Sequence, residues 1–262
     1  MLTLLSPAKK LNFDEVQTQV EITQPRLADD TREIAQVAKQ QSAADLAKLM
    51  HISDKLADLN AERFKTFDLD GRSNSAKPAG LTFDGDVYWG LEAKSLGEET
   101  LSYAQDHLRI LSGLYGILRP MDAIQPYRLE MGTKMANPRG KSLYDFWGSR
   151  IGAKLAEDLG DHADQTVVNL ASNEYFKAVD TSVLPGKVIE ASFLNVKDGE
   201  ARRLMYHVKF ARGLMARWIM ENRIEKADDL RGFNAEGYTL DTNASSETEL
   251  VFTRPQPPVK KK

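Results

Sequence analysis

The chain has no cysteine among its 262 residues. That absence excludes a disulfide framework, a thiolate nucleophile, cysteine-ligated iron–sulfur clusters and zinc sites built on thiolates. Histidine is scarce too, and the four histidines show neither an i,i+4 pair nor another spacing typical of metal ligands. They are His51, His107, His162 and His207. The sequence therefore predicts no metal site and no cofactor.

Long apolar runs are also missing, since none approaches the roughly 18 residues that a helix needs to cross a bilayer. The first ten residues reach Pro7 and two lysines after only a few apolar positions, which is not the order of a secretory signal. We therefore expect a cytoplasmic protein without a membrane partner.

An excess of positive charge is absent, because the formal net charge is −3. Any surface that binds nucleic acid must then be a local basic patch on an acidic body. With 42% hydrophobic and 28% charged residues, the composition is that of an ordinary globular protein. We expect one α+β domain over residues 1–254 and a disordered, proline-rich tail over residues 255–262.

Common catalytic templates are missing as well. The chain holds no Gly-x-x-x-x-Gly-Lys-Ser/Thr loop, no Gly-x-Gly-x-x-Gly fingerprint and no Gly-x-Ser-x-Gly elbow. No catalytic residue is therefore assigned from a motif.

The elements that are present indicate a mixed sheet with packed helices. Residues 2–5 are typical of a short buried strand, and residues 188–196 and 200–207 of two strands joined through an Asp-Gly turn. Residues 80–90 also suggest a strand. Helices are expected over residues 43–66 as a pair, and over 98–111, 143–159 and 208–223. Since helices and strands alternate without a clean βαβ rhythm, a mixed sheet is favoured over a doubly wound fold.

The helix pair over residues 43–66 is the strongest positive signal for a binding function. An apolar helix end is followed by His51-Ile52-Ser53 and then by Lys55. In a helix-hairpin-helix unit, the hairpin amides and the start of the second helix face a phosphate. Lys55 would add charge there, and Arg63 follows one to two turns later.

The same segment has a second interpretation. The two hairpin positions that glycine usually holds are occupied by His51 and Ser53, and their side chains limit close approach of a strand. Asp54 would also oppose a phosphate. The segment is therefore equally consistent with an ordinary helical corner in which Ile52 is buried and Ser53 or Asp54 caps the second helix.

Two further basic segments are candidates. Lys209 and Arg217 lie at helical spacing beside an apolar stripe, with Arg212 between them, and together they suggest a phosphate groove. Tyr127-Arg128 lies in a loop fixed by prolines and a glycine, and is suited to stack on a base and bind a phosphate. The alternatives are a solvated helix face paired with carboxylates, and an Arg128 paired with a neighbouring acid.

A strand end supplies the last candidate. Residues 2–5 would deliver Ser6, Lys9 and Lys10 to the carboxyl end of the sheet, where open α/β sheets place ligands. Lys9 would suit an anion there. An enzyme acting on a small phosphorylated or nucleotide substrate would use Lys9 as the anion holder and Asp86 or Glu174 as the acid or base.

Seven segments in this order resemble the bacterial peroxide stress resistance protein YaaA family, and the resemblance spans nearly the whole chain. They are Leu4-Leu5-Ser6-Pro7-Ala8-Lys9, Gly85-Asp86-Val87-Tyr88, Leu111-Ser112-Gly113-Leu114-Tyr115-Gly116, Gln125-Pro126-Tyr127-Arg128-Leu129-Glu130-Met131-Gly132, Asn169-Leu170-Ala171-Ser172, Glu174-Tyr175-Phe176 and Ala211-Arg212-Gly213-Leu214-Met215.

The resemblance implies a cytoplasmic protein induced by hydrogen peroxide that limits oxidative damage and keeps unincorporated iron low. It also implies one compact α+β body of unusual architecture, with a helix-hairpin-helix and a positively charged cleft for double-stranded DNA. Carried onto this sequence, the expected nucleic-acid contacts are Lys9, Lys10, His51, Ser53, Lys55, Arg63, Arg128, Lys209, Arg212 and Arg217.

We therefore predict a protective protein that binds duplex DNA through phosphates, without reading sequence, and whether it is also an enzyme stays open. The alternative hypothesis is the enzyme at the Ser6–Lys10 strand end. A deep pocket that gathers Lys9, Asp86 and Glu174 would favour the enzyme, and a broad cationic groove would favour DNA. No protein partner is predicted.

Overall fold

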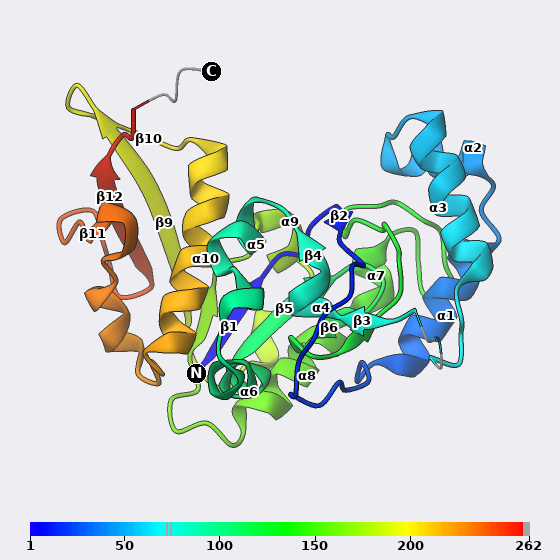
Figure 1. Ribbon diagram of the computed structural model, residues 1–262, viewed down its shortest axis with the longest axis horizontal. Coiled ribbons are helices and arrows are strands. Elements are labelled where there is room, and N and C mark those ends of the chain that lie inside the picture. Colours follow the sequence, from blue (N-terminus) through cyan, green and yellow to red (C-terminus); the bar gives the residue numbers. More distant parts are fainter. Residues whose placement is uncertain (72, 74, 259–262) are drawn as a thin grey trace.

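The computed structural model describes residues 1–71, 73 and 75–258, and a central sheet organises this part of the chain (Figure 1). The strands of that sheet are β1 Leu2–Leu5, β5 Leu108–Ser112, β6 Gly116–Leu118, β8 Val167–Asn169, β9 Val188–Lys197, β10 Glu200–Arg202, β11 Thr239–Leu240 and β12 Glu249–Pro255. Within the described residues their order is β11-β12-β9-β8-β1-β5-β6, and β10 pairs with β9. Parallel and antiparallel pairs both occur, so the predicted mixed sheet is confirmed.

The remaining elements surround the sheet. Two short pairs join β2 Lys10–Leu11 to β4 Phe83–Asp84, and β3 Lys77–Pro78 to β7 Ala123–Ile124. The α-helices are α1 Ala28–Lys39, α2 Ala43–Met50, α3 Asp54–Thr66, α4 Ala79–Thr82, α5 Asp86–Leu91, α6 Glu98–His107, α7 Leu143–Trp147, α8 Arg150–Leu159, α9 Asn173–Phe176 and α10 Met205–Glu221, and the 3-10 helices are η1 Ala93–Ser95, η2 Thr181–Val183, η3 Ala227–Gly232 and η4 Ala235–Gly237. Over the described ranges, no helix combines the length and the apolar character needed to cross a bilayer.

The parallel strands of the sheet decide where a ligand site can form. β1 pairs in parallel with β5 on one side and with β8 on the other, and β9 and β12 continue in parallel beyond β8. After β1 the chain therefore adds β5 on one side of that strand and later adds β8 on its other side. In open sheets the carboxyl ends of the strands at such a reversal form a crevice that binds ligands. Here that crevice lies above β1 and β8.

Burial follows from this position. Leu2, Leu4 and Leu5 of β1 have no exposed surface, as expected for a parallel strand covered on both faces. β9 instead alternates, and its inward Phe193 joins an aromatic cluster with Phe252 of β12. The apolar strands therefore hold the crevice on a rigid base.

Two glycines let α5 and α10 cross at close range. A Cβ at Gly213 of α10 would lie 1.8 Å from the carbonyl oxygen of Val87, and a Cβ at Gly90 of α5 would lie 2.1 Å from the carbonyl oxygen of Phe210. No larger side chain fits between the two backbones. Gly213 therefore serves the packing of the two helices.

Four sequence expectations are wrong in detail. The helix predicted over residues 98–111 ends at His107, and residues 108–112 form β5. The strand predicted over residues 200–207 ends at Arg202, and α10 begins at Met205. Residues 143–159 form α7 and α8 instead of one helix, because Gly148 adopts φ 48° between them. Residues 80–90 form α4, the two-residue β4 and α5 instead of a strand, because Gly80 and Gly90 pack against neighbouring backbone. At Gly90 the close packing against α10 overrides the local pattern.

The helix pair over residues 43–66 is confirmed as α2 and α3. Ser42 caps α2 by accepting from the amide of Asp45, whose carboxylate bonds back to the Ser42 amide. His51 ends α2 in the left-handed region, at φ 50°, where the connection turns into α3. Ser53 stands at the N-cap of α3 without a side-chain cap bond.

The tail predicted over residues 255–262 begins on an ordered position. Pro255 is the last residue of β12, where it pairs with Val196 of β9. Residues 259–262 of that prediction lie outside the described residues.

Candidate functional site

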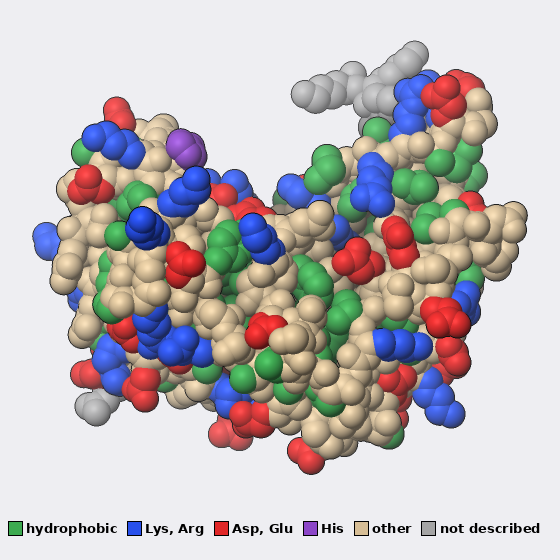
Figure 2. Space-filling model, turned by 180° about the vertical axis from the view of Figure 1, so that it is seen from behind, with side chains coloured by type: hydrophobic (Ala, Val, Ile, Leu, Met, Phe, Trp, Pro, Cys, Tyr) green, Lys and Arg blue, Asp and Glu red, His purple; other side chains and the backbone are tan. Residues whose placement is uncertain are grey.

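A pocket of about 570 Å³ occupies the crevice above β1 and β8. Its lining residues come from five separate segments: residues 6–10 after β1, residues 84–89 at α5, the loop 127–130, residues 172–175 after β8, and Lys209 and Arg212 of α10. In Figure 2 the upper edge of the molecule is hollowed between helices α2 and α3 on one side and the hairpin of β9 and β10 on the other. The crevice predicted by the strand order is thus open to solvent.

Ser6 joins three of these segments at the base of the pocket. Its Oγ accepts a hydrogen bond from the Ser172 amide at 2.8 Å, which ties the end of β1 to the end of β8. The hydroxyl of Tyr88 donates to the Ser6 carbonyl oxygen at 3.0 Å, which adds α5. Burial raises the pKa of Tyr88 well above its ordinary value, so this hydroxyl stays a neutral donor.

Glu130 pairs with two of the predicted phosphate contacts. Its carboxylate lies 2.8 Å from Lys9 Nζ and 2.8 Å from an Nη of Arg128. Burial raises the pKa of Glu130, but the hydrogen bonds from Lys9 and Arg128 outweigh it and leave the pKa below its ordinary value. Of the two interpretations of Arg128, the structure has the internal pair with Glu130.

Lys10 has a partner as well. Its Nζ lies 2.5 Å from Asp84, and the indole of Trp89 donates to the other oxygen of the same carboxylate at 2.7 Å. These two hydrogen bonds lower the pKa of Asp84. Trp89 itself is 52% exposed beside the pocket.

The two cations of α10 differ from each other. Lys209 Nζ lies 3.8 Å from Asp86, a loose ion pair. Arg212 makes no hydrogen bond or ion pair with any residue in the described part of the chain, and its Nε is shielded from solvent. Burial lowers the pKa of Arg212, and the positive charge of Arg203 lowers it further.

A second hollow extends the pocket toward the helix pair. It measures about 420 Å³ and shares Glu130 and Glu174 with the first pocket, while its other wall includes His51 and Lys134. Glu174 accepts a hydrogen bond from the Gly132 amide at 2.9 Å through one carboxylate oxygen. The α2–α3 turn therefore faces the same groove as the strand ends.

The other predicted contacts lie outside the pocket. Lys55 is exposed on α3 beside Ser53, and Arg63 follows on the same helix at 3.4 Å from the side-chain oxygen of Asn60. Arg217 is held against the end of α5, where it donates to the carbonyl oxygens of Leu91 and Glu92. Arg217 thus stabilises the crossing of α5 and α10, and it does not line the pocket.

The charge of the pocket is mixed. Five cations line it, Lys9, Lys10, Arg128, Lys209 and Arg212, and four carboxylates lie among them, Asp84, Asp86, Glu130 and Glu174. The family resemblance groups these cations in one cleft, whereas Asp86 and Glu174 are expected near Lys9 only under the enzyme hypothesis, and Asp84 is not assigned to the site. Among the described residues, no three His, Asp or Glu side chains are grouped so that they could hold a metal ion.

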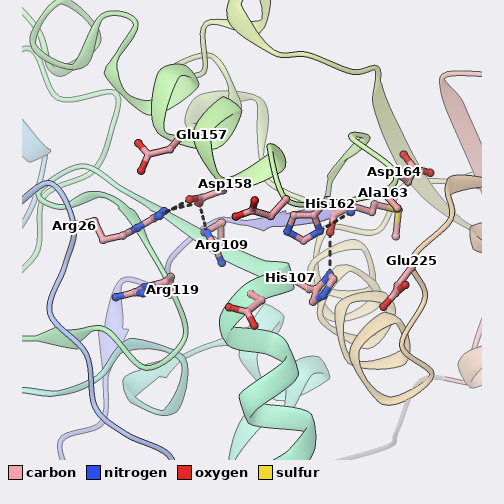
Figure 3. A pocket seen from close by; sticks show the side chains of 13 residues that line it. Arg26, His107, Arg109, Arg119, Glu157, Asp158, His162, Ala163, Asp164 and Glu225 are labelled. Atoms are coloured by element: carbon pink, nitrogen blue, oxygen red, sulfur yellow. Dashed lines mark hydrogen bonds and ion pairs between the residues drawn. The ribbon is translucent and has the colours of Figure 1, made fainter.

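Another polar pocket, at the opposite edge of the sheet, was missed by sequence reasoning (Figure 3). Asp158 of α8 bridges Arg26 and the buried Arg109 of β5, whose Nε lies 2.6 Å from the carboxylate. Nearby, the Met1 amino group donates to His162 Nδ1 at 2.8 Å. Burial, then the amino-group charge and His107, lower the pKa of His162 to about 4. Only Arg109, a charge inside an apolar strand, signals this cluster in the sequence.

Comparison with known proteins extends over nearly the whole chain. The family described as "Peroxide stress protein YaaA" matches residues 1–244. A UPF0246 protein of Maricaulis maris is 52% identical over 257 residues, covering 98% of this chain and 97% of the relative. UPF0246 proteins of Phenylobacterium zucineum and Caulobacter vibrioides are each 50% identical, over 98% of this chain and 96% and 100% of their own lengths. The chain therefore belongs to the YaaA family of peroxide stress proteins.

Proposed function

We propose that this protein acts in the peroxide stress response by binding double-stranded DNA through phosphate contacts along the groove, without reading sequence. The observation that carries the proposal is the convergence of Lys9, Lys10, Lys209 and Arg212, from two distant segments, on one hollow. The α2–α3 turn borders the same hollow with His51. By covering DNA, the protein would limit oxidative damage. Its part in keeping free iron low stays an expectation from the family resemblance.

The internal ion pairs do not prevent such binding. The side chains of Lys9 and Lys10 are 66% and 74% exposed, and exposed ion pairs contribute at most about 1 kcal/mol. A phosphate can therefore compete with Glu130 and Asp84 for these lysines. Lys55 projects from the α2–α3 lobe with no ion pair among the described residues, so it is the natural first contact.

The test is fluorescence anisotropy of a labelled duplex at several salt concentrations, with Lys55→Gln against Lys65→Gln. Both lysines are exposed on α3, but Lys65 lies in its last turn beside Glu62, away from the groove. Lys55→Gln should weaken binding on all sequences and lower the slope of log K against log salt by about 1. Equal effects of the two variants would contradict the proposed surface.

One observation favours a second candidate function, an enzyme acting on a small phosphorylated or nucleotide substrate. The pocket gathers Lys9, Asp86 and Glu174, the three groups that this hypothesis requires. Lys9 would hold the anion, and Asp86 or Glu174 would move a proton. Incubation with nucleotides and sugar phosphates, followed by phosphorus NMR, tests it: turnover that Glu174→Gln abolishes and Glu99→Gln retains supports an enzyme, and a panel without turnover contradicts it.

A further inference from the structure

Arg212 is the one lining cation that forms no hydrogen bond or ion pair with the described part of the chain, although the negative charge of Glu190 acts on it from a greater distance. Lys9, Lys10, Arg128 and Lys209 each have a carboxylate within 4 Å, whereas the guanidinium of Arg212 has none. Its Nε is withdrawn from water without a hydrogen bond. A guanidinium stays charged and offers five N–H donors, so leaving it unpaired in a partly buried place is costly unless an anion binds there.

The fold holds Arg212 firmly in this position. The neighbouring Gly213 packs directly against the backbone of α5, which fixes how closely α10 lies to the pocket wall formed by α5. Lys209 lies one turn earlier on α10, and residues three apart share a helix face. Its loose pair with Asp86 leaves it available to the same anion. An arginine guanidinium can bind two phosphate oxygens at once, and a nearby lysine adds a second positive charge.

The rest of the lining suits a flat ring. Tyr88, Tyr127 and Tyr175 line the pocket and are almost fully buried. The hydroxyls of Tyr88 and Tyr127 are already bonded, to the Ser6 carbonyl oxygen and to Ser112 Oγ at 2.7 Å. Their rings therefore contribute only small apolar patches to the wall of the pocket. Trp89 adds an exposed aromatic side chain, and stacking on aromatic rings binds bases of any identity.

We propose that the pocket binds one nucleoside monophosphate unit, with Arg212 and Lys209 on the phosphate and the tyrosine side of the pocket against the base. Its volume of about 570 Å³ lies within the range of small-ligand sites. Glu174 uses one carboxylate oxygen for Gly132, so the other accepts from a base amino group or a sugar hydroxyl. The unit comes from one of two sources, a free nucleotide or a nucleotide turned out of bound DNA.

Only the DNA-derived source rests on the proposed function. The first experiment therefore uses free ligands: calorimetric titration of the full chain with dAMP, deoxyadenosine and deoxyribose 5-phosphate. The monophosphate should bind at least about tenfold more tightly than either part, because it uses both halves of the site. Arg212→Gln should weaken dAMP about 10- to 100-fold and leave deoxyadenosine unchanged. Arg231→Gln, on η3 outside the pocket, should change neither.

Thermal unfolding of Arg212→Gln shows whether the variant folds, and Arg212→Lys is the second variant, which keeps the charge but loses the fork. The second experiment places 2-aminopurine in a duplex, whose fluorescence rises when the base leaves the stack. A rise that excess dAMP reverses assigns the DNA source, and dAMP binding without a rise assigns the free nucleotide. Failure of dAMP to bind, together with no rise, overturns the inference even if duplex binding persists. Binding of dAMP without duplex binding supports the inference and overturns the proposed function instead.

Discussion

Replacing Gly213 with alanine tests whether the α5–α10 crossing positions the pocket. The new Cβ would lie 1.8 Å from the carbonyl oxygen of Val87 and 2.7 Å from the amide nitrogen of Leu91. Both neighbours are backbone atoms, which cannot rotate aside as a side chain does. Overpacking in a tight core costs about 1–3 kcal/mol, and this contact belongs at the upper end. The gain in helix propensity from glycine to alanine returns about 1 kcal/mol.

The net loss of about 2 kcal/mol should lower the melting temperature by about 4–8 °C in a protein of this size. Circular dichroism during heating measures this loss, and urea unfolding checks that the slope of the transition is unchanged. Gly232→Ala is the control, since its Cβ would meet nothing nearer than Trp218 at 4.0 Å. If Gly213→Ala is as stable as the original chain, the close crossing is not what holds Asp86 and Lys209 together.

Three further predictions concern the helix pair and the second polar pocket. Ser42→Ala should lower the free energy of unfolding in urea by about 1 kcal/mol, because it removes the cap of α2. Ser53→Ala should lower it much less, since Ser53 makes no side-chain cap bond to α3. Equal losses would refute the assignment of Ser42 as the capping residue. Asp158→Asn leaves Arg109 with a buried, uncompensated charge and should cost about 3–5 kcal/mol at pH 7, and a loss below 1 kcal/mol would show that water reaches Arg109. The pKa of His162 is about 4 in the folded state, below its unfolded value of 6.5, so between these pH values the unfolded chain binds more protons than the folded chain. The free energy of unfolding should therefore fall as the pH decreases from about 6.5 to about 4. His162→Gln should make this decline shallower, and an unchanged decline would contradict the role assigned to His162.

The sequence predicted elements whose pattern is local. β1 is a short, mainly apolar run, and α2 and α3 are separated by the short turn His51-Ile52-Ser53, so both were predicted with nearly correct bounds. α5 could not be predicted, because residues 86–91 form a helix only against the glycine of a partner helix that lies over one hundred residues further on. The break at Gly148 likewise depends on the left-handed conformation of one residue.

For the site, the sequence indicated which residues suit a phosphate, but not which charged residues lie next to one another. Lys9, Arg128 and Arg212 were each named as cations suited to phosphate, and the structure brings all three to one pocket. The pair of Arg128 with the neighbouring Glu130 was one of the two interpretations of that loop, whereas the pair of Lys9 with Glu130 joins segments far apart in the sequence, and no sequence spacing shows it. The expected uniformly positive cleft is therefore a mixed one in which Arg212 alone is left unpaired among the described lining residues.

Salt-dependent binding of duplex DNA tests the central claim most directly. The full chain would be titrated against two duplexes of equal length and unrelated sequence, at salt concentrations from about 50 to about 200 mM. The proposed phosphate contacts predict that log K falls linearly with log salt, with the same slope for both duplexes and about 0.9 per phosphate contacted. No binding at the lowest salt, or an affinity that does not change with salt, would contradict the claim.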